Sequence, residues 1–367
     1  MSAVRGRAGL LACSCDFDLP DEAPRGAGSP SLALIAAGFS FSILAQALAF
    51  AALPIAGAIL APSPAATTAP VVLMLAGAAL STFPASFLTG LFGRRSAFAL
   101  GASLGVAGAA LGAWGVASGQ FAGLCLGAFW LGTAQGFGLF YRHAVGSSPR
   151  AIALVLGSAS LAAFAAPAVV GIAQALVGPL APAGALIGAG LAQVCVLMLA
   201  APLPSAIELG EGERRWRQDT PGFIAVTAAA ALAWFGMMLL MTGAPLAMAG
   251  CGLGLGAASS GIAWHVLAMY APAAVIGASG WRPPAAPTTF FGLGLLAIGC
   301  VLVRLQTSAG GFDLALIVGG CGWSLATLGA TQWIHARGEP PRALLALHDF
   351  ALFAGAVAGA MAVTVFA

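Results

Sequence analysis

The stretch Glu208–Asp219, ELGEGERRWRQD, is the longest charged segment of a chain that is otherwise almost continuously apolar. On both sides of it, apolar runs of membrane-spanning length follow one another with short breaks. Before the stretch they lie at 32–60, 68–91, 96–117, 120–141, 151–175 and 181–203, and after it at 221–247, 257–279, 287–304, 313–334 and 344–367. The sequence therefore predicts two helical bundles joined by a charged linker.

Composition also indicates a membrane protein. Of the 367 residues, 60% are hydrophobic and only 7% are charged, and the mean hydropathy is +0.99. A soluble domain of this length does not have such a composition. We expect an all-α polytopic membrane protein with about 11 transmembrane helices, which transports a solute and is not an enzyme.

Basic residues give the expected orientation. Every basic residue is Arg, and the net charge of +3 predicts no nucleic-acid partner. If the segments alternate, nearly all arginines fall on one side, which the positive-inside rule places in the cytoplasm together with the N-terminus. We expect a multi-pass membrane protein. The expected parts are a tail at 1–30, a six-helix bundle at 31–205, a linker at 206–220 and a bundle of about five helices at 221–367.

Two neighbouring segments after the linker carry pairs of soft metal ligands. Met237 and Met241 lie one helical turn apart, and so do His265 and Met269. Residues at i and i+4 share one face of a helix, so the two faces could bring three thioethers and an imidazole together. This ligand set suits Cu(I). We therefore predict a copper site formed by Met237, Met241, His265 and Met269, with copper as the transported ion and no resident cofactor.

Acidic residues are missing from the middle of the expected segments. Asp313 and Asp349 lie near segment ends, so hard cations would lack oxygen ligands, and a carboxylate proton relay is not visible. The Arg142-His143 pair at the end of the fourth segment is interpreted as a topology anchor. A negative cell interior would favour inward movement of Cu(I) by about 2.3 kcal/mol per 100 mV, and cytoplasmic thiols or a copper chaperone would trap the ion.

The sequence also resembles a known superfamily of transporters. Gly93-Arg94-Arg95 is similar to the end of the loop that follows the second helix in the major facilitator superfamily, with Ser86 and Gly90 at that loop's glycine and aspartate positions. The matching loop in the second half reads GASGWRPP, residues 277–284. The resemblance implies two helical bundles; the superfamily usually has twelve helices.

Four motifs of the second half resemble one bacterial subgroup, the CcoA-like copper importers. The motifs are MMLLMTGAPLAMAGCG (237–252), WHVLAMYAP (264–272), GCGWSLATLGAT (320–331) and ALHDFALFAG (346–355). The resemblance implies that Met237, Met241, His265 and Met269 bind copper. It also implies that the chain lies in the bacterial inner membrane and supplies copper for cytochrome c oxidase assembly.

Two other functions remain open. In an organic-solute permease of the same superfamily, the methionines would serve only to pack the core. Such a protein should carry charged or several aromatic-polar groups mid-membrane, where we expect almost none. In a non-transporting oxidase assembly factor, the fold would persist without the transport cycle. The reduced loops of the two halves motivate this third hypothesis.

Overall fold

A computed structural model describes residues 32–204, 220–253, 255–336, 338 and 340–362. The expected tail at 1–30 and nearly all of the linker at 206–220 lie outside the described residues, so the domain boundaries stay predictions. The described chain is helical. The first half contains α1 Leu32–Leu60, η1 Pro64–Ala66, α2 Ala69–Ala117, α3 Phe121–Leu139, η2 Phe140–His143, α4 Pro149–Ser158, α5 Ser160–Val177, η3 Gly178–Leu180 and α6 Ala181–Ala200. The second half contains α7 Thr220–Gly250, α8 Leu255–Ser279, α9 Ala285–Leu305, α10 Ala309–His335 and α11 Arg342–Ala362.

Helix α2 reverses its direction at Gly93. The backbone there has φ 79° and ψ 168°, a conformation that glycine adopts at little cost because it has no Cβ. Before the turn, Ser81 bonds to the Thr133 carbonyl at 3.1 Å. After it, Gly101 faces Phe137 and Gly115 faces Leu124, so residue numbers now fall along α3 as they rise along α2. The two parts of α2 therefore run antiparallel and cross the membrane separately.

The same reversal separates α5 from α6. Gly178 has φ 51°, and beyond it Gly184 packs against Ala173 and Gly188 against Val169. Within the described residues, nine stretches are long and apolar enough to span a membrane, and two of these exceed 50 residues. Because those two turn back on themselves, the nine stretches make eleven crossings. The predicted fold class is confirmed, and the helix bounds lie close to the predicted ones.

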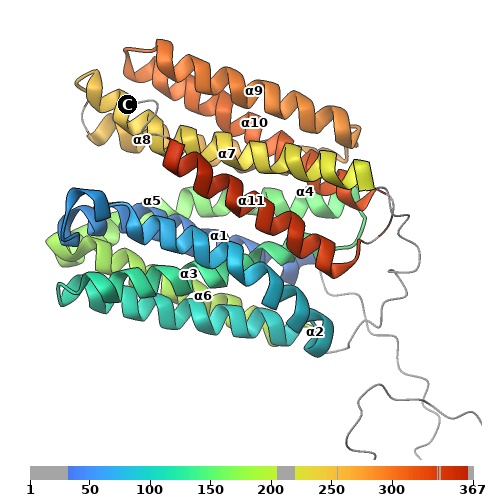
Figure 1. The fold of residues 1–367 in the computed structure, drawn as a ribbon, viewed down its shortest axis with the longest axis horizontal. Coiled ribbons are helices and arrows are strands. Elements are labelled where there is room, and N and C mark those ends of the chain that lie inside the picture. Colours follow the sequence, from blue (N-terminus) through green and yellow to red (C-terminus); the bar gives the residue numbers. More distant parts are fainter. Residues whose placement is uncertain (1–31, 205–219, 254, 337, 339, 363–367) are drawn as a thin grey trace, which may run out of the picture.

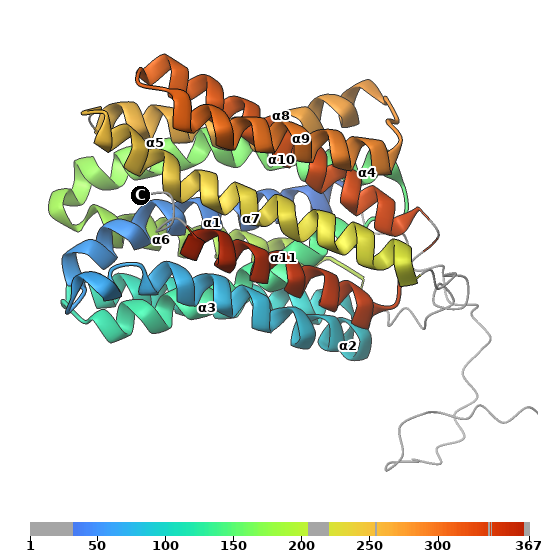
Figure 2. The same cartoon turned by 45° about the horizontal axis from the view of Figure 1, so that its top comes forward.

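The two halves lie side by side, with their helices roughly aligned (Figures 1 and 2). Contacts between α2 and α11 and between α4 and α8 join them. Phe83 and Phe350 pack across the first contact, with ring centroids 5.4 Å apart and the ring planes tilted by 46°. At the second, Gly157 lets the backbone approach Ala274. The two halves thus have the closely packed, small-residue interfaces that membrane helices favour.

One end of the bundle carries six of the seven arginines that lie in the described part of the chain. Successive helices alternate in direction, which brings the turn of α2, η2 and the starts of α4, α9 and α11 to the same end. The arginines in these places are Arg94, Arg95, Arg142, Arg150, Arg282 and Arg342. We call this the arginine-rich end.

Candidate functional site

The predicted copper ligands lie in the core of the second half. Met237 and Met241 are in α7, whereas His265 and Met269 are in α8. Met237, His265 and Met269 are buried, and Met241 is half-buried. Helix α10 packs against both α7 and α8, which make less contact with each other. Coordination of one ion by all four residues stays a prediction.

The imidazole of His265 is held by the backbone of α10. Its Nδ1 lies 2.7 Å from the Leu316 carbonyl oxygen, and because a carbonyl only accepts, Nδ1 donates the proton. Gly320 allows this close approach. The Nε2 atom is buried without a hydrogen-bond partner and carries the lone pair. Among the described residues, no group of three or more His, Cys, Asp or Glu could hold a metal ion.

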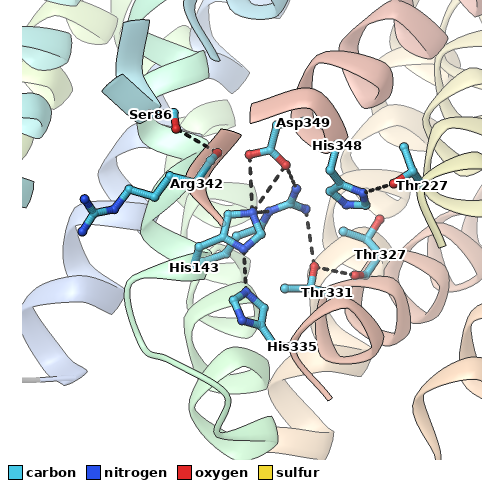
Figure 3. Close-up of polar contacts among 10 residues, drawn as sticks. Ser86, His143, Thr227, Thr327, Thr331, His335, Arg342, His348 and Asp349 are labelled. Atoms are coloured by element: carbon cyan, nitrogen blue, oxygen red, sulfur yellow. Dashed lines mark hydrogen bonds and ion pairs between the residues drawn. The ribbon is translucent and has the colours of Figure 1, made fainter. Parts of the chain in front are cut away.

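A second polar cluster joins the two halves at the arginine-rich end (Figure 3). Arg142 of η2 forms an ion pair with Asp349 of α11. The exposed fractions of the two residues are 1% and 0%. Arg142 Nη1 also donates to Thr331 Oγ1 of α10 at 3.4 Å. The topology role of Arg142 stays a prediction, but its side chain is not at the surface, because the turn of η2 directs it into the interface between the halves.

Two imidazoles continue the cluster. His143 Nδ1 lies 2.9 Å from His335 Nε2. His143 Nε2 lies 3.3 Å from Arg142 Nε and 3.4 Å from Asp349 Oδ1, so this nitrogen faces both a guanidinium donor and a carboxylate acceptor. His348 bonds instead to Thr227 of α7, at 3.0 Å, within the second half. We call Arg142, His143, Thr331, His335 and Asp349 the interface cluster.

Further bonds between the halves lie at the same end. Ser86 of α2 donates to the Arg342 carbonyl at 2.8 Å, and Gln332 of α10 donates to the Pro149 carbonyl at 3.0 Å. Arg150 Nε donates to the Gly277 carbonyl at 3.3 Å. Each bond couples an element of the first half to one of the second. Together with the interface cluster they hold the arginine-rich end closed.

A buried ion pair such as this one is difficult to separate in the absence of water. Its formation costs desolvation free energy that offsets much of the attraction, whereas separating the partners without water strands two charges. The halves can therefore part here only if water or a proton reaches the pair. The arrangement suits a gate that is either fully closed or fully open.

Aromatic side chains from four helices meet deeper in the second half. Trp234 of α7, Tyr270 of α8, Trp323 of α10 and Phe353 of α11 all lie near the middle of their helices. Trp323 contacts Trp234 and Tyr270 with ring centroids 5.7 and 5.8 Å apart, and Trp234 contacts Phe353 at 5.1 Å. We call these four residues the aromatic cluster. The expectation that the mid-membrane region lacks aromatic-polar groups is therefore wrong.

Comparison with known proteins decides the family. No protein-family model matches the chain. It is 34% identical over 339 residues to the riboflavin transporter RfnT of Brucella anthropi, and the match covers 84% of each protein. Among solved structures, the proton:xylose symporter XylE of the major facilitator superfamily has a similar fold, with a TM-score of 0.69, 11% identity, and coverage of 91% of this chain and 86% of that chain.

The chain belongs to the same family as RfnT and has the fold of the major facilitator superfamily. It is a multi-pass membrane transporter and not an enzyme. The human organic anion transporter MFSD10 also shares the fold, with a TM-score of 0.66, 15% identity, and coverage of 91% of this chain and 93% of that chain. The predicted resemblance to the fold of this superfamily is confirmed. The narrower resemblance to copper importers is not, because the curated relative is named for riboflavin.

Proposed function

We propose that this transporter carries a flat, neutral organic solute of the flavin type by alternating access, with riboflavin as the first candidate. The 34% identity to RfnT over most of both chains carries the proposal. The aromatic cluster supports it, since aromatic side chains stack well on planar rings. The Arg-rich loops support an orientation with the arginine-rich end and the N-terminus in the cytoplasm of a bacterial inner membrane.

The interface cluster gives a physical basis for the transport cycle. With the arginine-rich end closed, solute would reach the centre of the protein from the opposite, periplasmic side. Opening toward the cytoplasm would then separate Arg142 from Asp349 and His143 from His335, which are contributed by opposite halves. Solute binding must favour the state in which these contacts can break, since a ligand shifts a conformational equilibrium only through its differential affinity.

Uptake in cells tests this proposal. A bacterial strain unable to make or import riboflavin would carry either the chain or an empty vector. We expect the chain to permit growth on low external riboflavin and to accumulate the labelled vitamin. Normal amounts of the protein in the membrane without accumulation would overturn the proposal.

Copper is the second candidate, because His265 Nε2 is a buried lone pair without a partner in a helix that also carries Met269. In that case Met237, Met241, His265 and Met269 would bind the ion, which cytoplasmic thiols would then receive for cytochrome c oxidase assembly. Labelled copper uptake by the same strains tests this, and His265→Ala should abolish the uptake. If neither solute is accumulated but an oxidase is impaired by deletion, the assembly-factor hypothesis is favoured.

A further inference from the structure

The aromatic cluster contains polar atoms that the fold leaves without partners. The Nε1 atoms of Trp234 and Trp323 are buried and make no hydrogen bond, and the same is true of Ser324 Oγ and Thr327 Oγ1 on α10. Trp234 and Trp323 are each only 4% exposed. A buried donor without an acceptor is costly, and native proteins keep few of them unless they have a function. Two such indoles in contact with each other point to a missing acceptor.

The donor set defines the chemistry of that acceptor. An indole N–H can only donate, so it requires a carbonyl or a similar oxygen or nitrogen lone pair. The hydroxyls of Ser324 and Thr327 can either donate or accept. The four residues of the aromatic cluster carry no charge, so an ionised group would gain no counter-ion from them. The donor set therefore suits an uncharged planar heterocycle with carbonyl groups on its edge.

We propose that the aromatic cluster, with Ser324 and Thr327, binds the ring system of the transported solute, and that the indoles of Trp234 and Trp323 donate to its ring carbonyls. This inference rests on the proposed function and assigns its recognition site. The four helices that provide the cluster are α7, α8, α10 and α11, and α11 is also the helix whose Asp349 joins the interface cluster. Phe353 lies one helical turn beyond Asp349 on α11. A ring held here is thus placed to affect the gate through a single rigid helix.

Binding to the purified full-length protein tests the site. Riboflavin fluorescence should be quenched when its ring stacks against indole, which gives an affinity. Trp323→Phe and Trp234→Phe keep an aromatic ring but remove the N–H, and each should weaken binding about twofold to tenfold, the range expected for one net hydrogen bond. The matched control is Trp264→Phe, because Trp264 is 51% exposed on the outer face of α8 and should leave the affinity unchanged.

Competing ligands separate ring recognition from chain recognition. Lumiflavin, which keeps the ring but lacks the sugar-alcohol chain, should displace riboflavin, whereas ribitol should not. Unchanged affinity in both indole variants, or displacement by ribitol alone, would overturn the assignment of the site. If the wild-type protein does not bind riboflavin at all, the proposed function fails, so the two failures are distinguishable.

Discussion

Arg142 has the largest side chain among those that the described fold buries almost completely. Its guanidinium reaches Asp349 and Thr331 across the interface and His143 beside it in η2. A guanidinium in this position stays charged and cannot be relieved by losing its proton. The free energy of burying the Arg142 charge therefore depends on partners from the other half. It changes when the two halves move relative to each other.

Replacing one member of the ion pair tests this dependence. Arg142→Gln leaves the Asp349 carboxylate buried and uncompensated, which should cost about 3–5 kcal/mol of stability. The double variant Arg142→Gln/Asp349→Asn removes both charges and should recover most of the loss. Thermal unfolding of the purified protein in detergent measures both effects. A double variant no more stable than the single one would mean that the pair is not the main interaction of Arg142.

For single residues, the sequence indicated which side chains are chemically unusual for a membrane segment, but not which residues they contact. An ionisable residue inside a membrane segment is a functional hypothesis by default, and this reasoning identified His265. It passed over Asp349 and His143 because they lie near segment ends, where contact with water is the simplest expectation. Which residues they meet depends on contacts with residues up to 207 positions apart, which no local pattern contains.

At the level of whole helices, glycines set how closely two helices approach each other. A Cβ on Gly132 of α3 would overlap the carbonyl oxygen of Met74 in α2, whereas a Cβ on Gly171 of α5 would meet nothing within 4 Å. Both glycines are inside helices, so replacing either one by alanine brings the same gain in intrinsic helix propensity. The difference between them is therefore one of packing alone.

The pair Gly132→Ala and Gly171→Ala tests this difference. The first change must push α2 and α3 apart and should lower stability by about 1–3 kcal/mol, as overpacking does. The second should be neutral or slightly stabilising because alanine favours the helix. Melting temperatures of the two variants in the same detergent measure the contrast. Equal melting temperatures would show that α2 and α3 can separate without cost.

The closed arginine-rich end is a property of the whole molecule. In the closed state both ring nitrogens of His143 are engaged, Nδ1 by His335 and Nε2 by Arg142 and Asp349. The charged and titratable groups around it are Arg142 of η2, His335 of α10, and His348 and Asp349 of α11. One extra proton would let Nε2 donate to Asp349, but it would remove the acceptor for Arg142 Nε and place a second positive charge beside the Arg142 guanidinium in a buried site. The open, hydrated state accepts a proton more readily, so acid favours opening.

Distances between spin labels test the effect of pH. Arg95 and Arg282 are exposed residues of opposite halves at this end and can be replaced by cysteine after the seven native cysteines are removed. Below about pH 6.5, where hydrated imidazole takes up a proton, a longer distance should appear. The open-to-closed ratio should rise up to about tenfold per pH unit if one proton is taken up.

Two variants identify the titrating group. His143→Gln should abolish the acid response, because the amide cannot take up the proton. His348→Gln is the matched control, since this buried histidine bonds within the second half, and it should keep the response. A distance that does not change with pH in the otherwise unmodified protein would rule out acid opening without any need for these variants.

The sequence by itself determined that this chain crosses the membrane many times and roughly where its helices begin and end. The length of the apolar runs and the positions of Gly, Pro and Arg are local properties, and these properties decide how a segment inserts into the bilayer. It also marked the second-half motifs that matter. Only the tertiary structure decided which residues within those motifs meet. WHVLAMYAP contributes Tyr270 to the aromatic cluster, and GCGWSLATLGAT contributes Trp323. In lipid the apolar faces of helices are nearly equivalent, so partner choice depends on close packing and polar contacts between distant residues rather than on hydrophobic patterning.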